Sequence, residues 1–311
     1  MSFTAQVKDE LARVELACPN CAKAELAALI RIEGTLTISS AKPRLEIITE
    51  TVSVARTVIT LLHGSAYNLK TDLTVRRSVL HKTHNFLITV PAQAALEPAL
   101  RDLGILGEEG FIPGIKAGLV ARDCCAGAYL RGAFLAGGYI ADPRGDAHFE
   151  MKLSSPTIAE SIVKLMSLYD IKARCARRHN TYNVYIKGAE SIVNFLALTQ
   201  AHKAALRMEE QRVLKSVRND TNRRVNAEMA NVRKATRAAE EQIGVINALV
   251  ERRGLEGIPE TLREVAQLRI AHPSATIKEL GEYATPPLSK NAVYHRMTRL
   301  MEFAKACEQA D

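Results

Sequence analysis

The chain has 311 residues, 47% of them hydrophobic and 24% charged, so it can bury the cores of roughly two domains. The net charge of +8 favours polyanionic partners and says nothing about the fold. No apolar run is long enough to span a membrane, the start shows no secretory signal, and six cysteines do not make a disulfide framework. We therefore expect a cytoplasmic protein with reduced thiols and no membrane partner.

The first expected element is a short amphipathic helix over residues 3–15. Cys18 and Cys21 follow it, and such a Cys-x-x-Cys pair can be half of a zinc site or a redox pair. A zinc site needs four ligands, and the nearest other cysteines along the chain are the adjacent Cys124 and Cys125. We favour ordinary cysteines at a helix start, and we expect no metal and no cofactor.

Residues 130–138 have small side chains at helical spacing and end in two glycines. Small residues let two helices approach closely, and glycine tolerates the left-handed conformation that often ends a helix. Residues 26–34 match this stretch at an offset of 104 positions, and residues 44–47 match residues 148–151 at the same offset. The first part of the chain is therefore an internal duplication.

Each copy is expected to contain a helix, two strands, a helix, two strands and a final helix. For the first copy, about residues 22–120, the expected helices are 22–33, 52–62 and one from about 92, and the strands are 35–38, 44–49, 67–76 and 85–90. For the second copy, about residues 122–199, the helices are 122–137, 156–168 and 189–198, and the strands are near 139–141, 147–153, 171–178 and 182–187.

The third strand of each copy carries polar residues at the two-residue period of one strand face. The rows are Asn68, Lys70, Asp72, Thr74 and Arg76 in the first copy, and Lys172, Arg174, Ala176 and Arg178 in the second. A solvated sheet face explains the rows, but their repetition and the positive net charge also suggest a surface laid against phosphates. The candidate DNA contacts on this surface are Lys70, Arg76, Lys172, Arg174 and Arg178.

Residues 200–253 are expected to form a basic helical linker of one or two helices. Between Lys203 and Arg237 there are ten Lys or Arg and four Asp or Glu. A solvated helix face explains such a charge run, but the interleaved asparagines are poor helix formers and suggest hydrogen bonds with a partner. Arg223 and Arg224 are the candidate DNA contacts in this segment.

Residues 254–311 are expected to fold as three short helices, 259–270, 277–283 and 290–305, the plan of a helix-turn-helix domain. Thr276 and Glu279 match a capping box, and Ser289 is expected to cap the last helix. Asn291 has the amide geometry to pair with adenine, and His295 or Arg296 could meet guanine. The candidate DNA contacts are Ser289, Lys290, Asn291, Tyr294, His295, Arg296 and Arg299. The alternative is that Arg296 and Arg299 only pair with Glu302 and neighbouring carboxylates on the surface.

Residues 26–34 and 130–138 are similar to the signature of LAGLIDADG homing endonucleases. Together with the helix-turn-helix pattern and residues 222–231, they make the chain resemble the WhiA family of bacterial sporulation and cell-division regulators over essentially its whole length. The resemblance implies an α+β fold: a duplicated, saddle-shaped LAGLIDADG-like αββαββα domain (1–199), a basic helical linker (200–253) and an all-α helix-turn-helix domain (254–311). It also implies a transcription factor rather than a nuclease.

The residues at the motif ends bear on nuclease activity. In homing endonucleases the eighth motif position of each copy is a carboxylate that binds metal near the scissile phosphates. Here these positions hold Glu33 and Gly137, and Asp142 lies beyond the helix end as a poor substitute. We therefore predict a sequence-specific DNA-binding transcription regulator without enzymatic activity. The alternatives are a degenerate endonuclease or nickase using Glu33 and Asp142, and an RNA-binding protein.

The predicted partner is double-stranded promoter DNA. Another transcription regulator or RNA polymerase is a second candidate partner, because the duplicated domain could recruit protein rather than contact DNA. We expect a nucleoid-associated protein in the cytoplasm.

Overall fold

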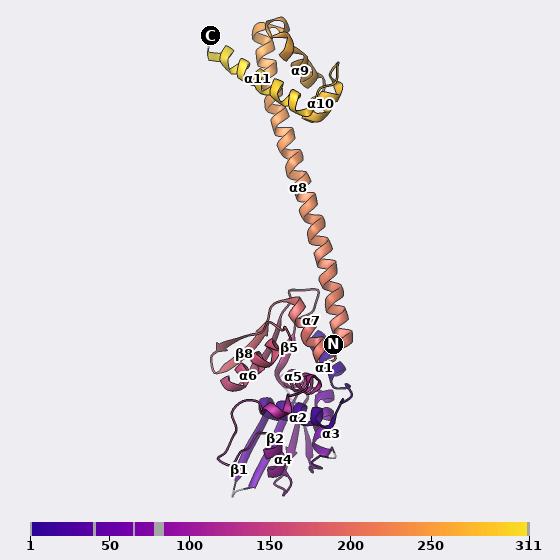
Figure 1. Ribbon diagram of the computed structural model, residues 1–311, viewed down its shortest axis with the longest axis vertical. Helices are drawn as coiled ribbons and strands as arrows, with labels where there is room; N and C mark the ends of the chain where they lie inside the picture. The colour runs from indigo at the N-terminus through magenta and orange to yellow at the C-terminus, as the bar shows by residue number, and fades with distance from the viewer. Residues whose placement is uncertain (1, 40–41, 65, 78–83, 310–311) are drawn as a thin grey trace. The chain divides into compact units, whose positions relative to one another are not determined.

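The computed structural model describes residues 2–39, 42–64, 66–77 and 84–309 (Figure 1). The chain divides into two compact units, Met1–Lys215 and Ser216–Asp311, and each is described by itself. Among the described residues, no helix combines the length and the apolar character needed to cross a membrane.

The first unit contains the predicted duplication, with the same element order and the same antiparallel strand order in both copies. Helix α1 (Phe3–Leu11) precedes the copies and is shorter than predicted. The first copy comprises α2 (Pro19–Glu33), β1 (Gly34–Ser39), β2 (Lys42–Thr49), α3 (Val52–His63), β3 (Asp72–Arg77), β4 (His84–Val90) and α4 (Leu96–Asp102). After the short helix η1 (Ala117–Leu119), the second comprises α5 (Asp123–Gly137), β5 (Gly138–Ile140), β6 (Phe149–Leu153), α6 (Pro156–Ser167), β7 (Arg174–Arg178), β8 (Thr181–Ile186) and α7 (Ala189–Leu198). The strands run in the order β1-β2-β4-β3 and β5-β6-β8-β7.

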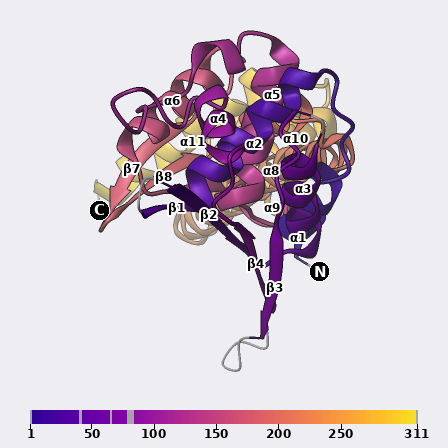
Figure 2. The ribbon, with the colours of Figure 1, turned by 90° about the horizontal axis from the view of Figure 1, so that it is seen from below.

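The two motif helices, α2 and α5, lie side by side in the core of this unit (Figure 2). A side chain at Gly132 would collide with the backbone oxygen of Glu25 and touch Ala28, which is the equivalent of Gly132 in the first copy. The small residues of the motif therefore allow the two helix backbones to meet, as the sequence predicts.

The prediction that the motif glycines adopt a left-handed conformation is wrong. Gly34 and Gly138, which end α2 and α5, have φ values of −75° and −83°, and each leads directly into a strand. Glycine is needed at the motif ends because a side chain would not fit there. A Cβ at Gly138 would collide with Phe134, and a Cβ at Gly137 would lie 2.6 Å from the backbone oxygen of Lys152.

The third strand of each copy begins later than predicted, at Asp72 and at Arg174. The connections before these strands return to the preceding helix instead of continuing the sheet. Leu69 is buried and its amide donates to the Leu62 oxygen at 2.9 Å, and Ile171 is buried in the second copy. The polar residues that therefore lie outside the strands are Asn68, Lys70 and Lys172. In the first copy α4 also begins at residue 96 rather than near 92.

Equivalent positions of the two copies are 104 residues apart from α2 to α3. Before the third strand this offset becomes two residues shorter. Asp72 and Glu46 share one pairing partner on β4, and Arg174 and Glu150 share one on β8. Because Glu46 and Glu150 match at the 104-residue offset, Asp72 and Arg174 are equivalent positions. By this register Lys70 corresponds to Lys172 and Arg76 to Arg178, so the 104-residue offset of the motif helices does not extend to the third strands.

Helix α8 (His202–Arg253) is one continuous helix, and from Ser216 onward it belongs to the second unit. Helix η2 (Leu255–Gly257) follows, then α9 (Glu260–Ala271), α10 (Ile277–Tyr283) and α11 (Lys290–Gln309), which confirm the three predicted helices. The core of this unit also takes in Ile246 and Leu249 of α8, upstream of residue 254. Val293, Met297 and Leu300 of α11 are buried, whereas Met301 is only half-buried.

Arg269 of α9 is the largest fully buried side chain of the second unit, with 2% exposure. Its Nε donates to Gln242 Oε1 of α8 at 3.0 Å, and its NH1 donates to the backbone oxygen of Ala275 at 2.6 Å. Burial lowers the pKa of this guanidinium. Arg269 therefore ties α8 and α9 to the loop that leads into α10.

Candidate nucleic-acid interface

The turn between α10 and α11 sets the position of the last helix. The Thr276–Glu279 capping box begins α10 as predicted. Gly281 of α10 accepts a hydrogen bond from the Leu288 amide at 2.8 Å, and a Cβ at Gly281 would collide with the Leu288 oxygen. Ser289 Oγ accepts from the Ala292 amide at 3.2 Å, which confirms it as the cap of α11.

The first two turns of α11 present a polar, basic face to solvent. Tyr294 is 60% exposed, and its ring meets that of His295 edge to face at 5.9 Å. The exposed predicted contacts on this helix are Ser289, Lys290, Asn291, Tyr294, His295 and Arg299. The face thus offers an amide, an imidazole and cations, which are the groups that hydrogen-bond base edges and phosphates.

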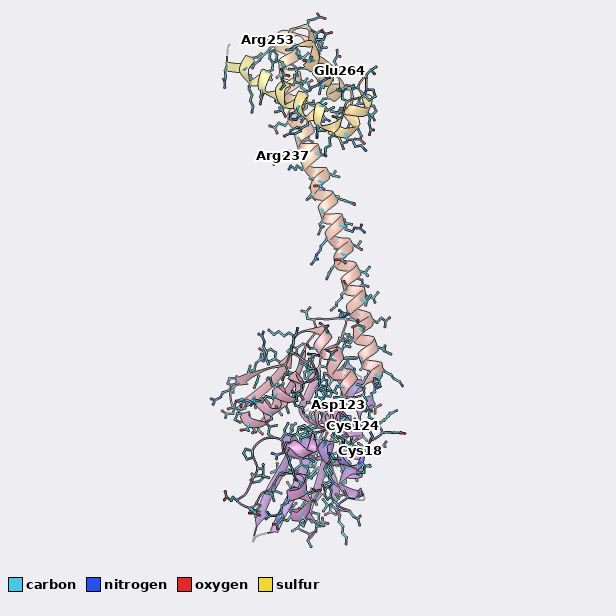
Figure 3. All side chains as sticks on the ribbon, viewed as in Figure 1. Cys18, Asp123, Cys124, Arg237, Arg253 and Glu264 are labelled. Carbon is cyan, nitrogen blue, oxygen red and sulfur yellow. The ribbon has the colours of Figure 1, made fainter. Side chains whose placement is uncertain are left out.

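Arg296 differs from its neighbours because it is half-buried. Its NH1 lies 2.8 Å from Glu264 Oε2 on α9, and Glu264 Oε1 accepts from the Thr285 amide at 3.3 Å (Glu264 is labelled in Figure 3). Arg296 therefore holds α11 and the turn against α9. No sequence pattern singles out Glu264, because its role depends on how α9 and α11 cross.

The middle of α8 is exposed on all sides from residue 216 to residue 238. Arg223 and Arg224 lie in this stretch, and Arg223 has an exposed partner, Asp220, at 4.0 Å. Figure 3 shows Arg237 near the end of the same stretch, and the side chains there stand away from the ribbon. Such exposed pairs contribute little to stability, so the basic groups of this stretch are accessible to a polyanion.

The outer faces of the two sheets differ in charge. In the first copy Arg44 and Arg76 share a face with Glu46 and Asp72, and Arg44 pairs with Glu46 at 2.8 Å. The corresponding face of the second copy carries Lys152, Arg174 and Arg178 against a single carboxylate, Glu150. Among the described side chains of the two faces, those of the second sheet are therefore the more basic, which the sequence rows alone did not distinguish.

Lys70 and Lys172 lie beside these sheets in the connections before the third strands. The Lys70 backbone exchanges two hydrogen bonds with the Gln93 amide group, at 3.1 and 3.0 Å. The Lys172 amide donates to Ser191 Oγ at 3.1 Å. Their backbones are thus fixed while both side chains are exposed.

The ends of the motif helices line a cleft of about 450 Å³ that includes Glu33 and Gly137. Burial raises the pKa of Glu33 to about 7, against the opposing effect of Lys8. Glu33 Oε2 is buried and has no hydrogen-bond partner among the described residues. Lys8, whose Nζ lies 3.4 Å from the Ala136 oxygen, comes from α1 and no sequence pattern indicated it.

Asp142 does not complete a carboxylate pair with Glu33. Its Oδ2 lies 2.9 Å from Arg144 NH2, and its Oδ1 accepts from the Arg144 amide at 3.0 Å. Arg144 lowers the pKa of the Asp142 carboxyl group. The carboxylate is thus engaged within its own turn.

Comparison with known proteins agrees with this architecture over the whole chain. Three family models match it: the WhiA N-terminal LAGLIDADG-like domain over residues 19–106, the WhiA LAGLIDADG-like domain over 126–218 and the WhiA C-terminal HTH domain over 221–304. A probable cell division protein WhiA of Desulforamulus reducens is 43% identical over 98% of this chain and 96% of its own length. The chain belongs to the WhiA family. A relative of the same name in Desulfitobacterium hafniense is 44% identical over 99% of this chain and 97% of its own length.

Solved WhiA structures share the fold. Full-length WhiA from Thermatoga maritima matches with a TM-score of 0.61 at 23% identity, over 98% of this chain and 99% of that chain. A WhiA N-terminal LAGLIDADG domain matches with a TM-score of 0.52 at 20% identity, over 64% of this chain and 90% of that chain. The α+β fold of a duplicated LAGLIDADG-like domain, a long helix and a helix-turn-helix region is therefore that of the WhiA family.

Proposed function

We propose that this WhiA-family chain is a sequence-specific DNA-binding transcription regulator that does not cleave DNA. The observation that carries the proposal is the exposed, basic start of α11, held by the Ser289 cap and the Arg296–Glu264 ion pair. In helix-turn-helix proteins the beginning of the second helix of the motif enters the major groove. The relatives named above are called cell division proteins, so genes of cell division are the proposed targets.

The proposed roles follow from the position of each side chain. Asn291 and His295 read base edges, whereas Lys290, Tyr294 and Arg299 contact phosphates. Ser289 and Arg296 position the helix rather than read sequence. The basic stretch of α8 with Arg223 and Arg224, and the second sheet with Arg174 and Arg178, add phosphate contacts. Lys172, Lys70 and Arg76 extend these contacts beside the sheets.

The absence of nuclease activity is proposed from the cleft at the ends of the motif helices. Cleavage of the homing-endonuclease type uses a metal-binding carboxylate from each copy. The cleft contains Glu33 from the first copy but Gly137 from the second, and it places the cation of Lys8 near Glu33. A lysine there disfavours a divalent cation through charge repulsion.

A binding and cleavage experiment on the full chain tests both parts. Genome-wide mapping of bound sites gives the preferred DNA sequence. Binding to a duplex of this sequence is then compared with binding to shuffled DNA and to RNA of the same sequence, at matched salt concentration. We expect specific binding to the duplex DNA and no Mg²⁺-dependent nick in supercoiled plasmid carrying that site. Equal binding to shuffled DNA, or preference for RNA, contradicts the proposed specificity. Nicking that Glu33→Ala abolishes supports the degenerate endonuclease instead.

The domain boundaries and partners are part of the same proposal. We propose a duplicated domain over 1–199, a helical linker over 200–253 and the DNA-binding region after it, with Ile246 and Leu249 of α8 completing its core. A second regulator or RNA polymerase remains the proposed protein partner of the duplicated domain. A regulator of this kind is expected on the nucleoid.

A further inference from the structure

Four cysteine side chains converge where the N-terminal ends of α2 and α5 meet. Cys18 is the N-cap of α2 and Cys21 lies in its first turn, whereas Cys124 and Cys125 lie in the first turn of α5. The four sulfur atoms all lie within 4.8 Å of one another, and Figure 3 shows Cys18 and Cys124 close together. The two cysteine pairs are remote along the chain, but the packing of the two helices brings them together.

The spacing of the sulfurs matches a tetrahedral metal site. The Sγ–Sγ distances are 3.4 Å for Cys18–Cys21, 3.6 Å for Cys18–Cys125, and 3.9 Å for both Cys21–Cys125 and Cys124–Cys125. Four thiolates at about 2.3 Å from a zinc ion are separated by about 3.8 Å. All four cysteines are free thiols. A four-iron cluster would hold its cysteine sulfurs further apart, because they surround several metal atoms.

The surroundings favour the thiolates that a metal needs. Both helices direct their N-terminal ends, which carry partial positive charge, toward the sulfurs. Asn20 Nδ2 donates to Cys125 Sγ at 3.4 Å and to the Gly118 oxygen at 3.3 Å, so it fixes this sulfur from outside the cluster.

Burial alone does not account for the cluster. Cys21 and Cys125 occupy equivalent positions of the two copies and are 2% and 0% exposed, as small apolar core residues would be. Cys18 and Cys124 are only half-buried, yet their sulfurs lie at the same point. Cys18 also lines a surface cleft of about 470 Å³, which gives solvent access to the cluster.

We propose that Cys18, Cys21, Cys124 and Cys125 bind one zinc ion that clamps the starts of α2 and α5 together. Binding replaces the thiol protons with four Zn–S bonds, releases those protons to solvent and involves no change of oxidation state. Four protein ligands leave no open coordination position, so the ion is structural rather than catalytic. The site joins the two copies of the duplicated domain independently of any DNA contact.

Metal content of the full chain tests the proposal. The protein is purified without a polyhistidine tag and under reducing conditions, and its zinc is measured by elemental analysis. We expect one zinc per chain, lost almost completely in Cys21→Ser and in Cys125→Ser. Cys175→Ser on β7 and Cys307→Ser on α11 are matched controls, which should retain the zinc.

A second measurement on the unchanged chain covers the case in which the serine variants do not fold. Zinc is exchanged for Co²⁺, which should give the thiolate charge-transfer and intense ligand-field bands of a tetrahedral sulfur site. A chelator should lower the melting temperature, and Zn²⁺ but not Mg²⁺ should restore it. Folded protein without zinc and without cobalt bands overturns the proposal. Iron with inorganic sulfide, or disulfide bonds among the four cysteines in the reduced preparation, also overturns it.

Discussion

Arg131 of α5 donates hydrogen bonds from Nε and NH2 to the same oxygen of Glu25 on α2, at 3.0 and 2.6 Å. Both side chains are 3% exposed, so this ion pair lies in the interior between the two motif helices. Burial raises the pKa of Glu25, while Arg131 acts in the opposite direction. At the 104-residue offset the pair has no counterpart, because Ala27 and Tyr129 occupy the equivalent positions.

Arg131→Met should lower the free energy of unfolding of the first unit by about 3–5 kcal/mol, because it leaves the Glu25 charge buried without its partner. Chemical denaturation of the full chain, followed by circular dichroism, measures the change. Arg44→Ala is the control, since it removes the exposed 2.8 Å pair with Glu46 and should change stability by roughly 0–1 kcal/mol. Equal effects of the two substitutions would contradict the structural role of Arg131.

Two glycines in helices of the second unit should respond oppositely to alanine. At Gly281 a methyl group would collide with the Leu288 oxygen, so Gly281→Ala should displace the turn and weaken both stability and DNA binding. Gly244 on α8 has open space around its Cβ position, so Gly244→Ala should stabilise the helix by about 0.5–1 kcal/mol. The melting temperatures of both variants check this, and a loss of stability in both would count against the close approach at Gly281.

Much of the fold follows from the sequence because local patterns and the duplication agree. Helix α10 and its capping box lie where residues 276–283 predict them, since a cap depends only on neighbours along the chain. The starts of β3 and β7 were missed because polar alternation continues through their connections. It is the burial of Leu69 and Ile171, a tertiary effect, that keeps these connections out of the sheets.

The candidate sites also contain features that follow from the sequence and contacts that depend on tertiary packing. The exposed residues of α11 can be identified by counting from Ser289, because the periodicity of a single helix fixes the direction of each of its side chains. The Arg296–Glu264 pair and the meeting of Cys21 with Cys125 depend on how two helices pack. No spacing within a single segment encodes those contacts.

Glu33 should make the stability of the first unit depend on pH. Burial raises its pKa from 4.5 to about 7 in the folded chain, so the folded state binds the proton more tightly than the unfolded state does. The contribution is fully present below about pH 4.5 and is lost as the pH rises toward about 7. Glu33→Gln should remove this decline, and denaturation midpoints of the two proteins across this pH range measure it.

The control for Glu33 is Glu109→Gln, because Glu109 is an exposed carboxylate of the same unit. This variant should keep the pH dependence of the original chain. If Glu33→Gln also keeps it, the carboxyl group does not titrate as its burial implies. Comparing the pH dependence of stability of these two variants tests the titration of Glu33 whether or not the protein cleaves or binds DNA.

The last prediction separates base reading from helix positioning on α11. Asn291→Ala should cost about 1–3 kcal/mol on the preferred site and little on random DNA, because an amide pairs with particular base edges. Arg299→Ala should weaken binding to both about equally and reduce the salt dependence by roughly one ion, as expected for a phosphate contact. Arg296→Ala should lower the melting temperature of the second unit, since it breaks the 2.8 Å pair with Glu264.

Titration of the preferred and a random duplex at several salt concentrations, with the melting temperature of each variant, measures all three effects. Glu264→Gln should reproduce the loss of stability of Arg296→Ala, because it removes the other half of the same pair. Arg296→Ala with an unchanged melting temperature and a loss confined to the preferred site would make Arg296 a base-reading residue. Intact specificity in a folded Asn291→Ala variant would exclude Asn291 as a base-reading residue and would leave His295 as the base reader proposed for this face.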